Sequence, residues 1–535
     1  MSNGIDPMDT RQVAVGAGGG TDSDMAAQGG SFAGMTVLSR VSGLARDWVL
    51  AHVVGASEAA DTFILAFRVP NFFRRLFAEA SFALAFVPIL TEYREKGSQA
   101  GARAFVSAVA GDLGVVLIGV SVAGALGASL LAAVFMPGFI DDPEQFALAT
   151  DLTRIMFPYL GLISFTAFAG AILNSANRFA VPAFTPVLLN VSLIVAALWA
   201  AGAGSDVVGA ARALAWGVLA GGVAQLLFHG LPVARVGLLV APVPNWRHEG
   251  VGKVFRLLLP AVFAGSAYQV NALVGTVLTS FLEQGSAAWL YYADRLWEVP
   301  IGVVAVALGT VLLPNLSRLH QQGERAKYNA TLDWGMRTGL LLGIPAAVAL
   351  WMLAYPLMAT IFLHGQMQPR DAEMAAAALR AFALGLVPLV LVKIAVPGYF
   401  SREDATTPLK FAVASVAVNV AASLGTFWWL GHIGLALATS LAAVVNAGLL
   451  VGTLIAGGHY RPGRPLARVI ATSLMATAAM AAALWFLVPH DAHWTTAEGW
   501  SRAGHLALVI IAGLAVYSAL VLAAGIRPKD LRHRA

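Results

Sequence analysis

Charged side chains interrupt the apolar stretch RVPNFFRRLFAEASFALAFVPIL, which covers residues 68–90. Arg68, Arg74, Arg75 and Glu79 stand in it among Phe, Leu, Ala and Val. An ionised side chain at the centre of a bilayer costs about 2.5–3.5 kcal/mol on insertion scales. A membrane span that carries several of them therefore indicates a water-filled cavity, where guanidinium groups are suited to bind an anionic group such as phosphate.

Two further apolar stretches carry charge in the same way. The first holds Arg40, Arg46 and Asp47, and the second holds Asp294, Arg295 and Glu298. Most other apolar stretches are nearly free of charged residues. We expect Arg46, Arg74 and Arg295 to contact the anionic group, because they lie deep in their stretches and form a set of cations.

Helical spacing places several charges on shared faces. Asp61, Arg68 and Arg75 recur every seven residues, Arg75 and Glu79 are four residues apart, and so are Asp294 and Glu298. Lipid does not solvate such faces, so they must turn toward each other or toward water. A structural role stays open as the alternative. Arg40 can snorkel to the surface, Asp61 and Arg68 can fix helix packing, and Arg75 can pair with Glu79.

The elements that must position these charges are membrane helices. The 535-residue chain is 58% hydrophobic and only 12% charged, with a mean hydropathy of +0.73. Soluble domains carry roughly 25% charged residues. Apolar runs of about 20 residues recur along the chain without the alternation of barrel strands, which predicts an all-α polytopic membrane protein. The chain has no cysteine and no P-loop, HExxH or GxSxG motif, so we expect no metal, no cofactor and no enzyme.

About fourteen transmembrane helices are predicted. They cover residues 34–55, 62–91, 104–136, 150–174, 182–202, 207–230, 252–282, 288–317, 330–354, 376–400, 408–430, 433–456, 466–488 and 503–525. Loops after the even-numbered spans collect Lys and Arg, whereas loops after the odd-numbered spans are acidic, with Arg370 as the clear exception. The positive-inside rule therefore places both termini in the cytoplasm.

The chain also repeats itself after six spans. AFRVP is followed 20 residues after Arg68 by Pro88, and ADRLWEVP is followed 19 residues after Arg295 by Pro314. A parallel repeat of this kind is typical of transporters that alternate access to a central site. We therefore expect a disordered cytoplasmic tail over 1–31, six-helix bundles over 32–230 and 231–460, and two additional helices with a basic tail over 461–535.

Three segments resemble the MurJ/MviN family of the MOP exporter superfamily. They are SRVSGLARDWVLAHVVGASEAADTFILAFRVPNFFRRLFAEASFALAFVPILTEY, WLYYADRLWEVPIGVVAVALGTVLLPNLSR and VKIAVPGYFSREDATTPLK. The resemblance covers about residues 33–530. It implies a V-shaped cavity between two six-helix bundles, with two extra C-terminal helices forming a groove for a lipid tail. It also implies a multi-pass protein of the bacterial inner membrane.

Members of that family move lipid II, the undecaprenyl-pyrophosphate-linked peptidoglycan precursor, to the outer leaflet. The resemblance implies that Arg46, Arg74 and Arg295 bind the pyrophosphate and that Arg40 and Arg68 assist its way in and out. Asp47, Asp61, Glu79, Asp294 and Glu298 would support or gate these arginines. Two positions depart from the family: a common lysine is Arg68 here, and a serine of some members is Ala288. Contact with membrane lipids is expected and binding of nucleic acid is not, whereas coupling to ions or the membrane potential and contact with cell-wall synthesis proteins stay open.

Three alternatives share the fold or the substrate class. A flippase for another polyprenyl-linked oligosaccharide would use similar arginines, whereas a drug/cation antiporter would line its cavity with acidic residues. A membrane glycosyltransferase would need acidic catalytic residues on a sizeable loop. Asp141 and Asp142 are the nearest candidates, but PGFIDDPEQ is typical of a short outer turn.

Overall fold

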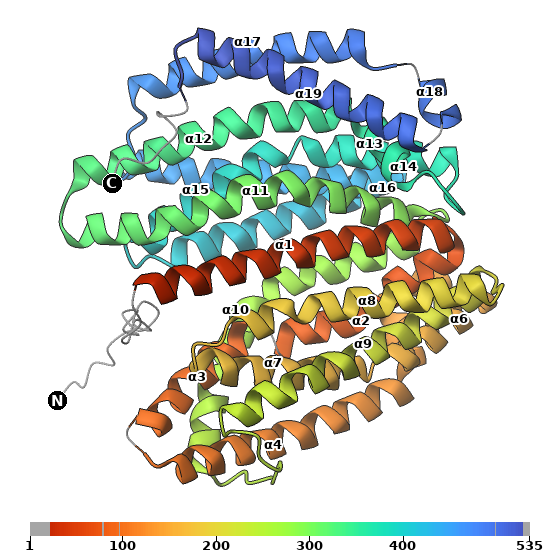
Figure 1. Cartoon of the computed structure of the whole chain (residues 1–535), viewed down its shortest axis with the longest axis vertical. Coiled ribbons are helices and arrows are strands. Elements are labelled where there is room, and N and C mark those ends of the chain that lie inside the picture. The colour runs from red at the N-terminus through yellow and green to blue at the C-terminus, as the bar shows by residue number, and fades with distance from the viewer. Residues whose placement is uncertain (1–21, 78–79, 96, 490, 498, 528–535) are drawn as a thin grey trace. The chain divides into compact units, whose positions relative to one another are not determined.

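The described part of the chain is helical. The computed structural model describes residues 22–77, 80–95, 97–489, 491–497 and 499–527 (Figure 1). These residues form nineteen α-helices and one short 3-10 helix. Glu79 and the terminal segments 1–21 and 528–535 lie outside the described residues. The expectations for Glu79 and for most of the tail over 1–31 therefore stay predictions.

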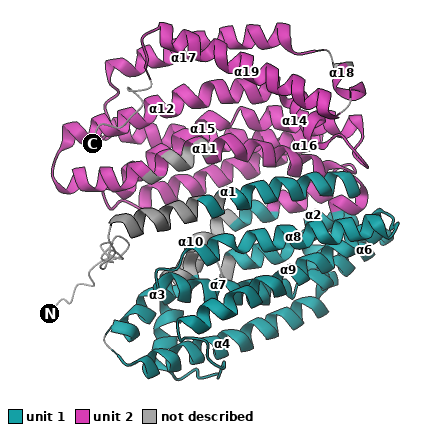
Figure 2. Cartoon of the chain, viewed as in Figure 1, with its two compact units in different colours: residues 1–53, 62–273 teal, residues 54–61, 274–535 magenta. Residues whose placement is uncertain are grey.

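The chain divides into two compact units (Figure 2). Unit 1 comprises residues 1–53 and 62–273, and unit 2 comprises residues 54–61 and 274–535. The division falls inside a helix rather than at the bundle boundary 230/231 expected from the repeat. The expected bundle boundaries therefore stay a proposal.

Unit 1 is built from the first ten helices. They are α1 (Asp22–Val53), α2 (Glu58–Phe77), α3 (Ala80–Glu95), α4 (Gln99–Leu126), α5 (Ala128–Phe135), α6 (Pro143–Met156), α7 (Tyr159–Ser175), α8 (Ala180–Gly202), α9 (Val207–Arg235) and α10 (Glu249–Ser280), with a 3-10 helix at Pro137–Phe139. Helix α8 packs against both α1 and α9, and α7 packs against α3, α4 and α9. The aromatic rings of Phe82, Phe86, Phe105 and Phe168 stack or tilt against one another in the core of unit 1.

The segment between α9 and α10 explains why unit 1 extends past residue 230. Its backbone lies along α4: Ser107 donates to the Ala241 carbonyl at 2.6 Å and accepts at its own carbonyl from Val243 at 3.2 Å. The buried Asp112 carboxylate accepts from the Asn245 amide at 2.7 Å. A Cβ at Gly111 would lie 2.3 Å from the Pro244 nitrogen, so this close approach requires glycine.

Unit 2 contains the remaining helices. They are α11 (Ser286–Gln321), α12 (Arg325–Met352), α13 (Ala354–Phe362), α14 (Pro369–Ala383), α15 (Leu386–Phe400), α16 (Thr406–Ala456), α17 (Arg464–Leu487), α18 (Asp491–Thr496) and α19 (Gly499–Ala523). Helix α11 packs against α12, α14 and α15, and α17 packs against α12 and α19. A core cluster that includes Leu341, Met480, Leu484 and Val509 joins α12, α17 and α19.

Eight helices of the described residues are long and apolar enough to cross a membrane, or nine if the bent pair α14 and α15 counts as one span. Helix α2 does not qualify, because every 18-residue stretch of it holds more than two charged residues. Large apolar side chains such as Leu126, Leu227 and Trp428 are exposed by 80%, 72% and 81%, as expected of surfaces that face lipid. The polytopic helical class is confirmed, and the number of fourteen spans stays a prediction.

Two breaks follow from local chemistry. Helix α16 contains two of the expected spans, and they meet at Gly431, whose φ of +52° and ψ of −129° suit glycine alone. Helices α14 and α15 are bent by 42° where Gly385 packs on Ser440. A Cβ at Gly385 would lie 2.7 Å from the Ser440 hydroxyl oxygen, so a larger residue would push the bend between α14 and α15 away from α16.

Candidate functional site

Arg46 is held in a fixed position in unit 1. Its Nε and Nη2 donate to one oxygen of Asp47 at 2.9 Å and 2.6 Å, and its Nη1 donates to the side-chain oxygen of Asn190 at 2.9 Å. The side chains of Arg46 and Asp47 are only 12% and 1% exposed. An ion pair this deeply buried needs all of its hydrogen bonds, because each missing one leaves a desolvated charged group.

Asn190 connects this ion pair to the packing of α8 on α1. Its amide nitrogen donates to the Ser42 hydroxyl at 2.9 Å and to the Ser39 carbonyl at 3.3 Å. The Ser42 hydroxyl in turn donates to the Ser39 carbonyl at 3.0 Å. Asparagines in membrane helices commonly bond between helices, and Asn190 does so here. The sequence alone did not reveal that Asn190 positions a guanidinium group, since the partner lies 144 residues away.

Arg40 lies on the exposed part of α1. Its neighbours Val37, Val41 and Leu44 are also exposed, by 60%, 61% and 41%. Arg40 makes no ion pair with any residue that the structure describes. The environment of Arg40 therefore differs from that of Arg46, whose side chain is largely buried and forms hydrogen bonds to both Asp47 and Asn190.

The arginines of α2 stand in different environments along the helix. Arg68 and Arg74 are half-buried, whereas Arg75 is exposed. The Arg74 Nε donates to the Asn71 side-chain oxygen at 3.1 Å, and Asn71 donates to the Phe67 carbonyl at 2.9 Å. Asn71 thereby fixes Arg74 from one helical turn away, a role that sequence reasoning missed although the spacing of three residues was there to suggest it.

Asp61 caps a helix of unit 2. Its two carboxylate oxygens accept from the backbone amides of Gly285 at 2.6 Å and Ala288 at 2.8 Å. These amides open α11, whose N-cap Gly285 has a φ of +96° and no side chain to serve as a cap. A carboxylate at this place satisfies two free amides and complements the helix dipole. The structural role that the sequence left open for Asp61 is thus supported by these contacts.

Arg295 lies on α11 among half-exposed groups. Its Nη1 donates to Glu298 at 3.0 Å, with side-chain exposures of 35% and 54%, and its guanidinium carbon lies 4.9 Å from the centre of the Tyr291 ring. A pair this exposed contributes little to stability, because water competes for both charges. Because the pair of Arg295 and Glu298 is weak, an incoming anion can replace Glu298 as the partner of Arg295. Asp294, on the same helix, is half-buried.

The three arginines favoured by sequence differ in how they are held. Arg46 is buried against Asp47 and Asn190, Arg74 is positioned by Asn71, and Arg295 is bonded to an exposed carboxylate. Arg46 and Arg74 belong to unit 1 and Arg295 to unit 2. Among the described residues, no group of three or more His, Asp or Glu could hold a metal ion.

Comparison with known proteins identifies the family. The family model for the lipid II flippase MurJ matches residues 50–499. The chain is 40% identical over 510 residues to the probable lipid II flippase MurJ of Haemophilus influenzae, covering 93% of this chain and 99% of that protein. It is 37% identical over 510 residues to the lipid II flippase MurJ of Burkholderia cenocepacia, covering 94% and 98%.

Solved structures show the same fold. A lipid II flippase MurJ in an inward closed conformation matches with a TM-score of 0.76 and 24% identity, over 93% of this chain and 99% of that one. An inward-facing multidrug resistance transporter of the MATE family and the MOP superfamily matches with a TM-score of 0.62 and 16% identity, over 79% and 95%. With the family model matched over most of its length and curated relatives at 37–40% identity, the chain belongs to the MurJ family of lipid II flippases.

Proposed function

We propose that this chain is a lipid II flippase. It moves the undecaprenyl-pyrophosphate-linked disaccharide-pentapeptide from the cytoplasmic to the periplasmic leaflet of the bacterial inner membrane, which it crosses several times. The observation that carries the proposal is the 40% identity over 93% of the chain to a relative of that name. Its reaction is transport by alternating access, with no covalent chemistry.

The pyrophosphate is bound by arginines. Arg46, Arg74 and Arg295 each contact it at some stage of the cycle, and Arg40 and Arg68 assist its way in and out. Guanidinium groups present planar pairs of N–H donors that match the oxygens of a phosphate. The fixed position of Arg46 supports its role, because a side chain that is already ordered loses less entropy on binding.

The carboxylates play two different roles in this proposal. Asp47, Glu79, Asp294 and Glu298 hold the arginines apart and release them to the substrate during the cycle. The exposed pair of Arg295 and Glu298 supports such an exchange, because its bond is weak in water. Asp61 instead secures the first turn of α11 through the amides of Gly285 and Ala288.

Both termini lie in the cytoplasm in this proposal, because the basic loops and the basic C-terminal tail fall on one side of the predicted spans. Coupling to the membrane potential requires that the carrier moves net charge across the field, and each such charge is worth about 2.3 kcal/mol per 100 mV. The five arginines and five carboxylates of the proposed site balance formally, so the site does not by itself imply this coupling.

The test uses bacteria depleted of their own lipid II flippase and complemented with this chain. Exposure of the lipid II headgroup outside the inner membrane is measured with an impermeant reagent, for the wild type and for Arg46→Ala, Arg74→Ala and Arg295→Ala. Each variant is quantified in the membrane by immunoblot. Arg256→Ala, an exposed arginine of unit 1 outside the set, is the matched control.

We expect the wild type and the control to restore exposure and the three variants to fail. A wild type that inserts but does not restore exposure would contradict lipid II as the substrate. A flippase for another polyprenyl-linked oligosaccharide would then be the next candidate. Normal activity of the three alanine variants would leave transport intact and remove the arginine site.

A further inference from the structure

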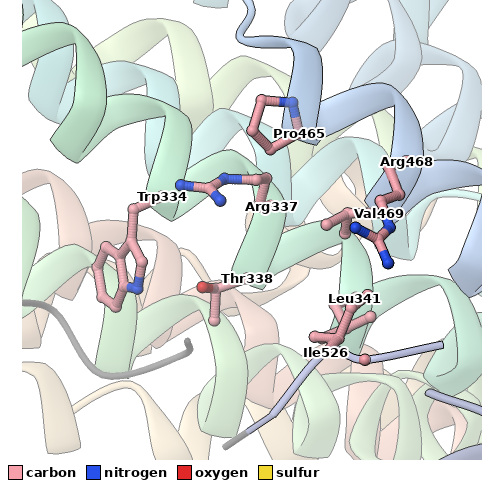
Figure 3. A pocket seen from close by; sticks show the side chains of 9 residues that line it. Trp334, Arg337, Thr338, Leu341, Pro465, Arg468, Val469 and Ile526 are labelled. Atoms are coloured by element: carbon pink, nitrogen blue, oxygen red, sulfur yellow. The ribbon is translucent and has the colours of Figure 1, made fainter. Parts of the chain in front are cut away.

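Unit 2 contains a pocket away from the arginines discussed so far. It has a volume of about 160 Å³ and lies between α12, the first turns of α17 and the segment after α19 (Figure 3). Its lining includes Trp334, Arg337, Thr338, Leu341, Arg468 and Ile526. This volume is about ten times the roughly 10–15 Å³ that one water needs, so a phosphate group fits.

Arg337 is anchored on one side of the pocket by a buried carboxylate. Its Nε lies 3.0 Å from an oxygen of Asp333, whose side chain is 7% exposed. The other Asp333 oxygen accepts from the Tyr460 hydroxyl at 2.9 Å and from the Gly463 amide at 3.0 Å. The described contacts of Arg337 thus use Nε, and both of its amino groups stay available to a ligand.

Arg468 brings a second cation to the pocket from α17 (Figure 3). Its Nη2 donates to the carbonyl of Ala524, just past the end of α19, at 2.8 Å. A carbonyl group fixes the guanidinium without neutralising it. None of the described residues that line the pocket is a carboxylate. Asp333, behind the lining, offsets the charge of Arg337, so Arg468 gives the pocket its net positive charge.

Apart from Thr338, the rest of the lining is mainly apolar and continues into the protein core. Leu341 and Val469 belong to the hydrophobic cluster between α12, α17 and α19. Tyr517 belongs to the same cluster, and its hydroxyl donates to the Leu341 carbonyl at 2.5 Å. A ligand in the pocket would therefore contact both guanidinium groups and aliphatic side chains.

The pocket lies at the level where the membrane spans end. Asn329 of α12 exchanges hydrogen bonds with the backbone of Arg461 in the linker before α17, at 2.6 Å and 2.9 Å. Arg337 is two helical turns farther along α12, level with the start of α17. Trp334 is a residue type enriched at such interfaces, and the surrounding loops are basic, as on the cytoplasmic side.

We propose that this pocket binds the phosphate of an anionic glycerophospholipid of the inner leaflet. The phosphate lies between Arg337 and Arg468, and the glycerol and acyl chains follow the apolar side formed by Leu341, Val469 and Ile526. Basic pockets between helix ends on the cytoplasmic side are suited to lipid headgroups. A lipid bound there would join α12, α17 and the end of α19 as a resident lipid distinct from the transported substrate.

The test is native mass spectrometry of the full chain purified in detergent and titrated with phosphatidylglycerol. Phosphatidylcholine, whose headgroup has no net charge, and inorganic phosphate serve as the comparison ligands. Arg468→Gln is the main variant because its own contact is a backbone carbonyl. Arg337→Lys is the second variant and keeps a cation beside Asp333. Arg461→Gln, an exposed arginine of the neighbouring linker, is the matched control.

We expect one phosphatidylglycerol to bind about tenfold more weakly to Arg468→Gln and to Arg337→Lys than to the wild type, since each loses a charge-assisted hydrogen bond. Arg461→Gln should bind as the wild type does. Equal binding by all four proteins, or equal binding of phosphatidylcholine, would overturn the proposal. Competition by inorganic phosphate with no lipid-specific binding would also overturn it, because the site would then be a free-anion site. Flippase activity is not the readout, so this result is independent of the proposed transport function.

Discussion

The side-chain oxygen of Asn190 accepts a hydrogen bond from the Arg46 guanidinium at 2.9 Å, across 144 residues of sequence. The same Asn190 donates to Ser42, one turn before Arg46 on α1. Helices α1 and α8 are therefore joined where Arg46 is held. This joint holds Arg46 from a second helix, in addition to its two hydrogen bonds to Asp47.

Replacing Asn190 with Ala should slow lipid II translocation while the protein still inserts. The change removes a hydrogen bond to a charged group, which contributes about 1.5–3 kcal/mol. If that positioning serves substrate binding, the translocation rate falls about tenfold, as measured by exposure of the lipid II headgroup in the depletion strain.

Asn419→Ala is the matched control for this change. Asn419 donates to Thr439 at 3.3 Å and accepts from Ser423 at 3.2 Å, and no described arginine contacts it. It should cost stability without the tenfold loss of transport. Asn190→Asp keeps the acceptor for Arg46 but loses the donor to Ser42 and to the Ser39 carbonyl, so its activity should lie between those of Asn190→Ala and the wild type. Equal transport by Asn190→Ala and wild type would mean that Arg46 needs no second partner.

Replacing Asp47 with Asn should lower the thermal stability of the protein more than removing the whole pair. Breaking one partner of a buried ion pair costs about 3–5 kcal/mol, because the other charge stays desolvated. The double variant Arg46→Gln with Asp47→Asn leaves no such charge. Its apparent Tm in detergent should lie above that of Asp47→Asn. The opposite order would show that Asp47 contributes through contacts other than its pair with Arg46.

Much of the fold was predictable because it depends on local composition. Apolar runs located the helices, and the boundary expected between 408–430 and 433–456 coincides with Gly431, the position of positive φ in α16. The division into units was less accessible. It depends on how the segment after α9 lies on α4, through Asp112 and the close approach at Gly111. Nothing in the local sequence of that segment specifies its partner.

The sequence could predict which residues belong to the candidate site, but not which side chains and backbone groups they contact. Intramembrane arginines stand out because their cost is high, so Arg46, Arg74 and Arg295 could be found from sequence. Their partners could not, because Asn190 is distant in sequence and an asparagine in a membrane helix is unremarkable. The seven-residue spacing of Asp61 and Arg68 indicated a shared face. It could not reveal that Asp61 reaches the amides that open α11.

The variants Asp61→Asn and Asp61→Ala distinguish two possible roles of Asp61: capping of α11 and gating of the transport cycle. Asparagine offers one acceptor oxygen where Asp61 uses two, and alanine offers none, at a cost of about 0.5–2 kcal/mol of stability. If Asp61 mainly caps α11, the apparent Tm should fall in Asp61→Asn and fall further in Asp61→Ala, and lipid II translocation should follow the Tm. Loss of transport in Asp61→Asn at an unchanged Tm would favour a role for the negative charge in gating.

Removing the hydroxyl of Tyr460 should destabilise unit 2 more than removing that of Tyr328. Tyr460 donates to the buried Asp333 carboxylate at 2.9 Å, and Tyr328 donates to the neutral Gly398 carbonyl at 2.6 Å. Burial, together with this carboxylate, raises the pKa of Tyr460 above its usual range, so its hydroxyl stays a donor at every physiological pH.

A hydrogen bond to a charged group contributes about 1.5–3 kcal/mol and a neutral one about 0.5–1.5 kcal/mol. Tyr460→Phe should therefore lower the apparent Tm of the purified protein further than Tyr328→Phe does. It also leaves Asp333 with one donor fewer beside Arg337, so Tyr460→Phe should loosen the linker before α17. Faster proteolysis at residues 457–463 in Tyr460→Phe than in Tyr328→Phe would report that loosening, and equal Tm values with equal proteolysis would show that Arg337 and the Gly463 amide suffice to hold the carboxylate.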